Sequence, residues 1–293
     1  MRHRLILILL TITASATAQD IDGILARLQG FKHPNGQYKF FNTDGVEIAC
    51  IPEDGILNPK TIAKKYREFK VKTDQLIFSD TLIGKPSYYY SGNSDEGTYE
   101  IFFIQNNERL LGVSFKSSYK IDRQFEREFI QLFIDNKIPE ENYQALAIAN
   151  GHVDFAGRKI TAHGCHWMNP NNLQCPYNGQ MDWSSYKTEE DATKMIDQRY
   201  KFLSTIKGGK ILSDEQVDIV FEGVEVKARR VVFDFKGVRS ALASLSGGET
   251  LTIYMVAAPV RDKYISCVGS FWNNDHVEPN GLPLLLSEVM SLK

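Results

Sequence analysis

The pattern of hydrophobic and polar positions predicts two successive units of similar make-up. In the first, alternating apolar residues predict strands over residues 36–51, and a helix follows that Asn58 caps and Pro59 opens. Aromatic-rich apolar runs, separated by Gly, Pro, Asn and Asp clusters, predict further strands at 75–83, 87–91, 99–105 and 110–119. An apolar stripe then predicts a second helix over 122–136.

The second half of the chain repeats this order. Strand-like residues at 153–160 and a loop bearing Cys, His and Trp precede a helix that Thr188 caps. The strands that follow are expected at 211–221, 224–235, 250–258 and 264–272, and a helix from Pro283 ends the chain. Ile77-Phe78-Ser79-Asp80 and Ile211-Leu212-Ser213-Asp214 occupy the same place in the two orders. We therefore predict an α+β protein with two antiparallel-sheet domains, each flanked by helices as an α/β/α sandwich and related by a divergent tandem duplication.

This order of elements resembles the α/β/α sandwich of the PsbP-like family, which includes lumenal photosystem II subunits and a yeast Ran-binding release factor. The likeness is carried by the second half, in residues 250–254, residues 264–268 and a short terminal helix that ends at 290–293. It implies a sandwich fold and a non-catalytic binding or assembly role. It implies no particular partner, because no residue here matches a functional site of that family.

The first 18 residues have the pattern of a cleaved signal peptide. A basic start with Arg2 and Arg4 precedes an apolar run, and small residues lead to Ala18, after which we expect cleavage. The run is shorter than the roughly 20 residues of a membrane-spanning helix, and no Cys follows the cut to carry a lipid. The expected organisation is a signal peptide at 1–18 and domains at 19–146 and 147–293, with a periplasmic or extracellular location and no transmembrane segment.

The charge balance excludes strongly basic or acidic classes of protein. The chain has 34 Lys and Arg against 36 Asp and Glu, and loss of the two leader arginines leaves a net charge of −4. This balance gives no electrostatic reason to expect nucleic acid or an anionic membrane as a partner.

The strongest chemical candidate is a loop that contains His163, Cys165, His166 and Cys175. These side chains are ligands of the kind zinc prefers, but their spacing matches neither of the usual paired zinc motifs. Because export implies an oxidising compartment, we favour a disulfide between Cys165 and Cys175, worth roughly 2–3 kcal/mol in the chain-entropy model. A zinc site on all four residues, or a catalytic Cys–His couple, are the alternatives.

Two further groups of residues bear on chemistry. Cys50 and Cys267 lie in apolar strands of different halves, so we favour buried free thiols over a bridge between them. Asp275 and His276 follow a predicted strand, where polar residues are usually turn formers. Together with the two loop histidines they are the possible polar cluster of an enzyme.

These observations favour a binding function over catalysis. The chain contains no Gly-x-Ser-x-Gly elbow, no His-Glu-x-x-His helix and no EF-hand loop. We predict an exported, non-catalytic binding or assembly module without a cofactor, whose ligand is an unknown protein or small molecule. The alternative is a hydrolase-like enzyme or a metal-binding protein that uses the loop from His163 to Cys175.

Overall fold

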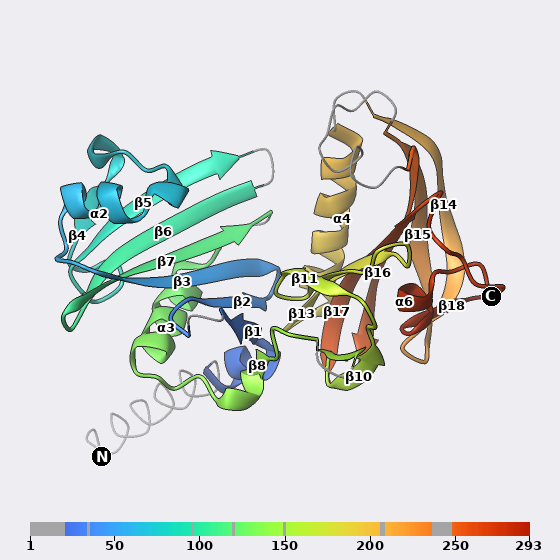
Figure 1. Ribbon diagram of the computed structural model, residues 1–293, viewed down its shortest axis with the longest axis horizontal. Helices are drawn as coiled ribbons and strands as arrows, with labels where there is room; N and C mark the ends of the chain where they lie inside the picture. Colours follow the sequence, from blue (N-terminus) through green and yellow to red (C-terminus); the bar gives the residue numbers. More distant parts are fainter. Residues whose placement is uncertain are drawn as a thin grey trace, which may run out of the picture.

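Two eight-stranded sheets lie next to each other in the computed structural model (Figure 1). The structure describes residues 21–33, 36–94, 97–118, 121–148, 151–205, 209–235 and 248–293. The predicted signal peptide at 1–18 lies outside these ranges. The first sheet contains the strands up to residue 144, and the second contains the strands from residue 166 onward.

The first sheet is antiparallel except at one edge, where β8 pairs with β1 in parallel. Its strand order is β4-β5-β6-β7-β3-β2-β1-β8. A helix over residues 21–27 precedes it. The bounds of its elements are β1 Gln29–Lys32, β2 Lys39–Thr43, β3 Val46–Asp54, α2 Pro59–Lys65, β4 Ile77–Ser79, β5 Ser87–Ser94, β6 Gly97–Asn106, β7 Arg109–Ser117, α3 Arg123–Ile134 and β8 Tyr143–Gln144, with short 3₁₀ turns at Arg67–Phe69, Thr73–Gln75 and Glu140–Asn142.

The second sheet is antiparallel throughout and is preceded by a separate two-stranded hairpin. Its strand order is β11-β12-β13-β17-β16-β15-β14-β18. The bounds of the elements in this half are β9 His152–Phe155 and β10 Arg158–Thr161 in the hairpin, then β11 His166–Asn169, β12 Asn172–Gln174, β13 Gln180–Tyr186, α4 Glu189–Thr205, β14 Lys210–Phe221, β15 Val224–Asp234, β16 Thr250–Val260, β17 Lys263–Trp272, α6 Leu284–Ser287 and β18 Met290–Leu292.

The two sheets share one strand order over seven strands. The run β4-β5-β6-β7-β3-β2-β1 has the same connectivity as β14-β15-β16-β17-β13-β12-β11. The helices also fall at equivalent points along the chain. In the first run α2 follows β3 and α3 follows β7, and in the second run α4 follows β13 and α6 follows β17. The two Ile-x-Ser-Asp segments fall at equivalent strands: residues 77–79 form β4, with Asp80 just after it, and residues 211–214 lie in β14. The repeated element order read from the sequence thus corresponds to a repeated sheet topology.

The predicted α/β/α sandwich is wrong, because the helices are too few and too short to form layers. In the described part of the chain, only α3 and α4 exceed seven residues. The helix α2 is about 10 Å long, whereas a strand of eleven residues, such as β16, spans about 36 Å. Strands dominate, and the terminal helix expected from Pro283 to residues 290–293 is only α6, which ends at Ser287 and is followed by the edge strand β18.

Each sheet buries apolar side chains on both of its faces. The helix α3 covers one face of the first sheet with Phe129, and Tyr66, just after α2, covers the other. The single hydroxyl proton of Tyr66 is shared between the carbonyls of Ile51 and Leu110, each 2.9 Å away. In the second half α4 covers one face, and α6, β18 and the hairpin β9–β10 cover the other. Short segments therefore complete each core.

The turn between β2 and β3 docks the first sheet onto the second. The Asp44 amide donates to the Ser185 carbonyl at 2.9 Å, and the Gly45 amide donates to the Ser184 hydroxyl at 2.9 Å. The Asp44 carboxylate also accepts from the Lys187 amide, and Arg27 holds that carboxylate through two hydrogen bonds of 2.9 and 2.8 Å. Hydrogen bonds of both main-chain and side-chain groups thus join the two sheets at this turn.

A buried charge cluster lies at the start of α3. The Glu126 side chain is only 1% exposed, and its carboxylate is 2.6 Å from the Arg123 guanidinium, which also pairs with Glu100 at 2.5 Å. Burial and the neighbouring Glu100 raise the pKa of Glu126 to about 8, although Arg123 opposes the shift.

Stability should therefore depend on pH through Glu126. The folded state holds the proton more tightly than the unfolded state, so this contribution is complete below about pH 4.5 and is lost as the pH rises through about 8. As the pH rises from acidic to mildly alkaline, the parent should lose this contribution and the Glu126→Gln variant should not. The free energy of unfolding of the variant should therefore rise by roughly 2–4 kcal/mol relative to that of the parent. Urea unfolding across that range measures the difference, with Glu128→Gln on the same helix as control. A difference that does not vary with pH would contradict this assignment.

Candidate functional site

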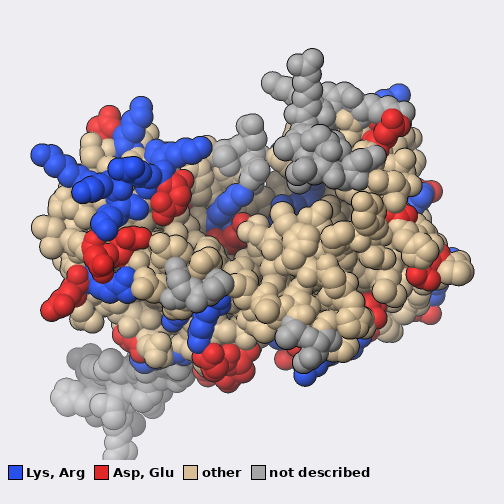
Figure 2. Space-filling view, viewed as in Figure 1, with Lys and Arg blue, Asp and Glu red and all other residues tan. Residues whose placement is uncertain are grey.

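A cavity of about 720 Å³ lies between the two sheets. The space-filling view shows this region as a hollow between the halves (Figure 2). The first half contributes Gly45 and Glu47 from the docking turn and β3, and Lys116 from β7. The second half contributes β11, β12, β13, β17 and the outward face of α4. The volume is in the range of ligand-binding clefts, roughly 300–1,000 Å³.

An ion pair occupies the wall where α4 crosses β13. The Arg199 guanidinium is 3.0 Å from the Asp182 carboxylate, and the two side chains are 40% and 28% exposed. Burial and, to a smaller extent, Glu47 across the cavity raise the pKa of Asp182 to about 6, although Arg199 opposes the shift. Both residues keep part of their polar surface open toward the cavity, where a ligand can reach it.

Amide side chains form much of the remaining wall. Gln198 projects from α4, and the other amides come from the strand side of the cavity: Asn169, Asn172, Gln174 and Gln180. Each amide carries both a donor and an acceptor, so this wall is suited to ligands that present both, as peptide groups do.

A second cavity, of about 200 Å³, continues from the first. Gln174, Gln180 and Ser270 line both cavities, and the Gln180 amide donates to the Ser270 hydroxyl at 2.8 Å. The second cavity also has His166 and Asp275 on its wall. The two cavities adjoin along β12, β13 and β17, and we refer to them together as the groove.

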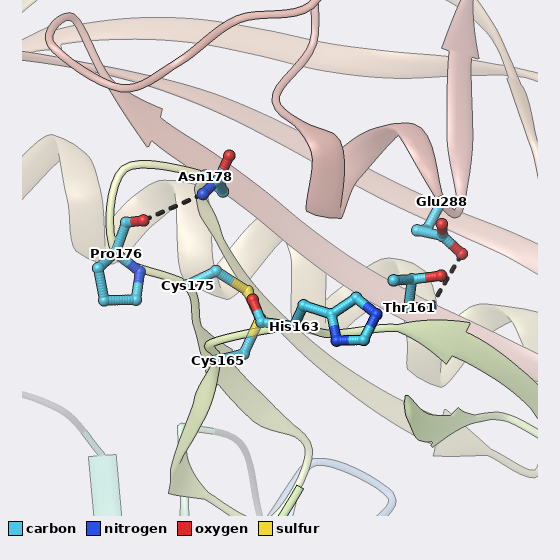
Figure 3. Close-up of a disulfide and its surroundings, with 7 residues drawn as sticks. All are labelled: Thr161, His163, Cys165, Cys175, Pro176, Asn178 and Glu288. Atoms are coloured by element: carbon cyan, nitrogen blue, oxygen red, sulfur yellow. Dashed lines mark hydrogen bonds between the residues drawn. A yellow bond between two sulfur atoms is a disulfide. The ribbon is translucent and has the colours of Figure 1, made fainter. Parts of the chain in front are cut away.

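The structure joins Cys165 and Cys175 in a disulfide (Figure 3). Their Cα atoms are 4.1 Å apart. The bridge spans the turn between β10 and β11 and the loop after β12. In this arrangement neither sulfur is a thiolate that could bind zinc, and no cluster of three or more potential metal ligands occurs among the residues that the structure describes.

The four residues of the predicted polar cluster do not all meet. His166 and Asp275 line the smaller cavity, where the Asp275 carboxylate accepts from the Trp272 amide at 2.9 Å and burial raises its pKa. His163 points away from the disulfide (Figure 3), with its ring 6.0 Å from that of His152. His276 is exposed and lies 3.3 Å from Glu278.

Cys50 and Cys267 are buried free thiols in separate sheets. Burial raises the pKa of both well above the usual value, so neither is a reactive thiolate.

Sequence reasoning missed the charged cavity residues Asp182 and Arg199. Their only local signal is the carboxylate of Asp182 between Met181 and Trp183 in β13.

No family model and no curated protein sequence matches the chain. Among solved structures, the immunity protein TplEi of the T6SS from Pseudomonas aeruginosa, complexed with "L" peptide, is 10% identical; the match covers 90% of this chain and 98% of that chain, with a TM-score of 0.23. The di-domain ARO/CYC StfQ of the steffimycin biosynthetic pathway is 9% identical over 83% of this chain and 72% of that chain, with a TM-score of 0.16. Both TM-scores are too low to indicate a shared fold, and we infer nothing about function from either protein.

Across the described ranges, none of the helices is both long and apolar enough to span a membrane.

Loss of the disulfide should destabilise the second half. Cys165→Ser with Cys175→Ser should lower the free energy of unfolding by roughly 2–3 kcal/mol, because the ten-residue separation closes a short loop in the unfolded chain. Alkylation of the unfolded protein without reductant should label Cys50 and Cys267 alone. Labelling of all four cysteines without reductant would contradict the pairing.

Proposed function

We propose that the protein is an exported, non-catalytic binding module that holds a polar, extended segment of a partner chain in the groove between its two sheets. The observation that carries this proposal is the composition of the larger cavity, which both halves build from amides and from charges of both signs. A main chain presents alternating donors and acceptors, and this wall offers partners for both.

The kinds of residue in the groove support binding over catalysis. The larger cavity is lined by no His or Cys among the described residues, so its serines lack an adjacent base of the usual kind. The smaller cavity has His166 and Asp275, but two main-chain amides occupy the Asp275 carboxylate. That carboxylate serves mainly to close the turn after β17.

Export rests on the order of features at the start of the chain. A basic stretch, an apolar run and small residues up to Ala18 form the pattern of a secretory leader. The Cys165–Cys175 disulfide is compatible with an oxidising compartment.

The groove can be tested with a library of short random peptides displayed on phage and selected on the immobilised protein. We expect selected peptides to lose about tenfold or more in affinity for the double variant Gln198→Leu with Lys201→Met, since both residues line the cavity from α4. The matched control is Lys194→Met, which removes one lysine of the same helix outside the cavity.

The control variant should bind the peptides within about twofold of the parent. Selected peptides that bind the double variant as tightly as the parent would place their site elsewhere. Turnover of ester, glycoside or peptide substrates that a single cavity substitution abolishes would contradict a non-catalytic role.

A further inference from the structure

A cationic face lies on the first sheet, at the end distant from the groove. The segment 58–75 carries six exposed cations against two carboxylates, Glu68 and Asp74, in a chain whose net charge is −2. Lys and Arg gather over α2 in the space-filling view (Figure 2). The cations of this face are Lys60, Lys64, Lys65, Arg67, Lys70 and Lys72. The near-neutral total thus conceals a strongly positive region.

Most of these cations are not used within the protein. Lys65 lies 3.5 Å from Glu53, and the other five form no ion pair within the described ranges. Solvated cations of this kind contribute little to stability. They concentrate positive potential on one convex part of the surface, where it can attract an anionic partner.

Exposed apolar side chains flank the cationic segment on both sides. Ile56, just before α2, is 71% exposed, and Phe78 in the edge strand β4 is 56% exposed. Phe78 pairs with Tyr88, and their rings are 5.4 Å apart. Because Tyr88 packs with the residues under α2, Phe78 lies on the same face of the sheet as the cations.

We propose that this face binds the surface of an anionic phospholipid bilayer. Lipid phosphates would neutralise the cations, while Phe78 and Ile56 would enter the region between headgroups and acyl chains. Neither groove cavity includes a residue of this face. A convex surface with single protruding apolar side chains fits the plane of a bilayer better than an acidic peptide, which would need a groove or a long free edge, and β4 has only three residues.

Co-sedimentation with vesicles tests the proposal. The full chain should bind vesicles of equal parts phosphatidylcholine and phosphatidylglycerol, and should bind phosphatidylcholine vesicles far more weakly. The triple variant Lys60→Gln, Lys64→Gln, Lys72→Gln should lose about 100-fold in affinity, or about fivefold per lysine. The matched control Lys159→Gln, Lys210→Gln, Lys263→Gln removes the same charge from the second half and should bind as the parent does.

Phe78→Ser separates insertion into lipid from simple charge attraction. It should weaken vesicle binding by about tenfold, whereas binding of soluble polyglutamate should not change. Equal loss in both triple variants, or no binding to either vesicle, would overturn the proposal. A third result would also overturn the proposal: the Phe78→Ser variant binds vesicles as tightly as the parent does, and the parent binds polyglutamate as tightly as it binds vesicles. That result would assign the face to acidic proteins. Thermal melting confirms that each variant is folded.

Discussion

The docking of the β2–β3 turn onto β13 is the constraint on which the rest of the arrangement depends. Each sheet completes its own core, so the relation between the sheets rests on a limited set of contacts. Gly45, with φ near 72°, lies where a Cβ atom would come within 2.2 Å of the Met195 Cε atom. A glycine suits this turn because its backbone is in the left-handed region, which L side chains rarely adopt, whereas the Met195 Cε atom is the end of a flexible side chain that could move. The same turn places Glu47 opposite Asp182, so the geometry of the groove follows from the docking.

The groove and the cationic face divide the molecule into two surfaces of different chemistry. In the groove, charges of both signs and amides lie together, and the Asp182–Arg199 pair is partly buried. On the cationic face, all the cations except Lys65 lack an ion pair within the described ranges, and apolar side chains protrude. The first surface favours a partner with a defined conformation, because amides and a partly buried ion pair impose geometry. The second favours any dense array of negative charge.

Local patterns predicted local structure well, and long-range packing accounts for what they missed. Asn58 and Thr188 act at the helix starts where capping chemistry placed them. The prediction of an α/β/α sandwich failed because the signals at the start of a helix do not determine its length. The helices α2 and α6 are too short to cover a wide sheet. The groove was missed because Asp182 and Arg199 come from a strand and a helix of the second half, and Glu47 reaches them from the first sheet only through the docking turn. The loop from His163 to Cys175 drew attention through its residue types, yet only His166 of its histidines lines a cavity.

The central claim is that the two sheets form one unit with a preformed groove. Native-state hydrogen exchange at the Asp44 and Gly45 amides tests this most directly, because both donate across the junction, to the Ser185 carbonyl and the Ser184 hydroxyl. We expect both amides to exchange as slowly as those of β13, through global unfolding. Exchange at the rate of an exposed turn, with the β13 amides still protected, would show that the sheets separate readily and would contradict it.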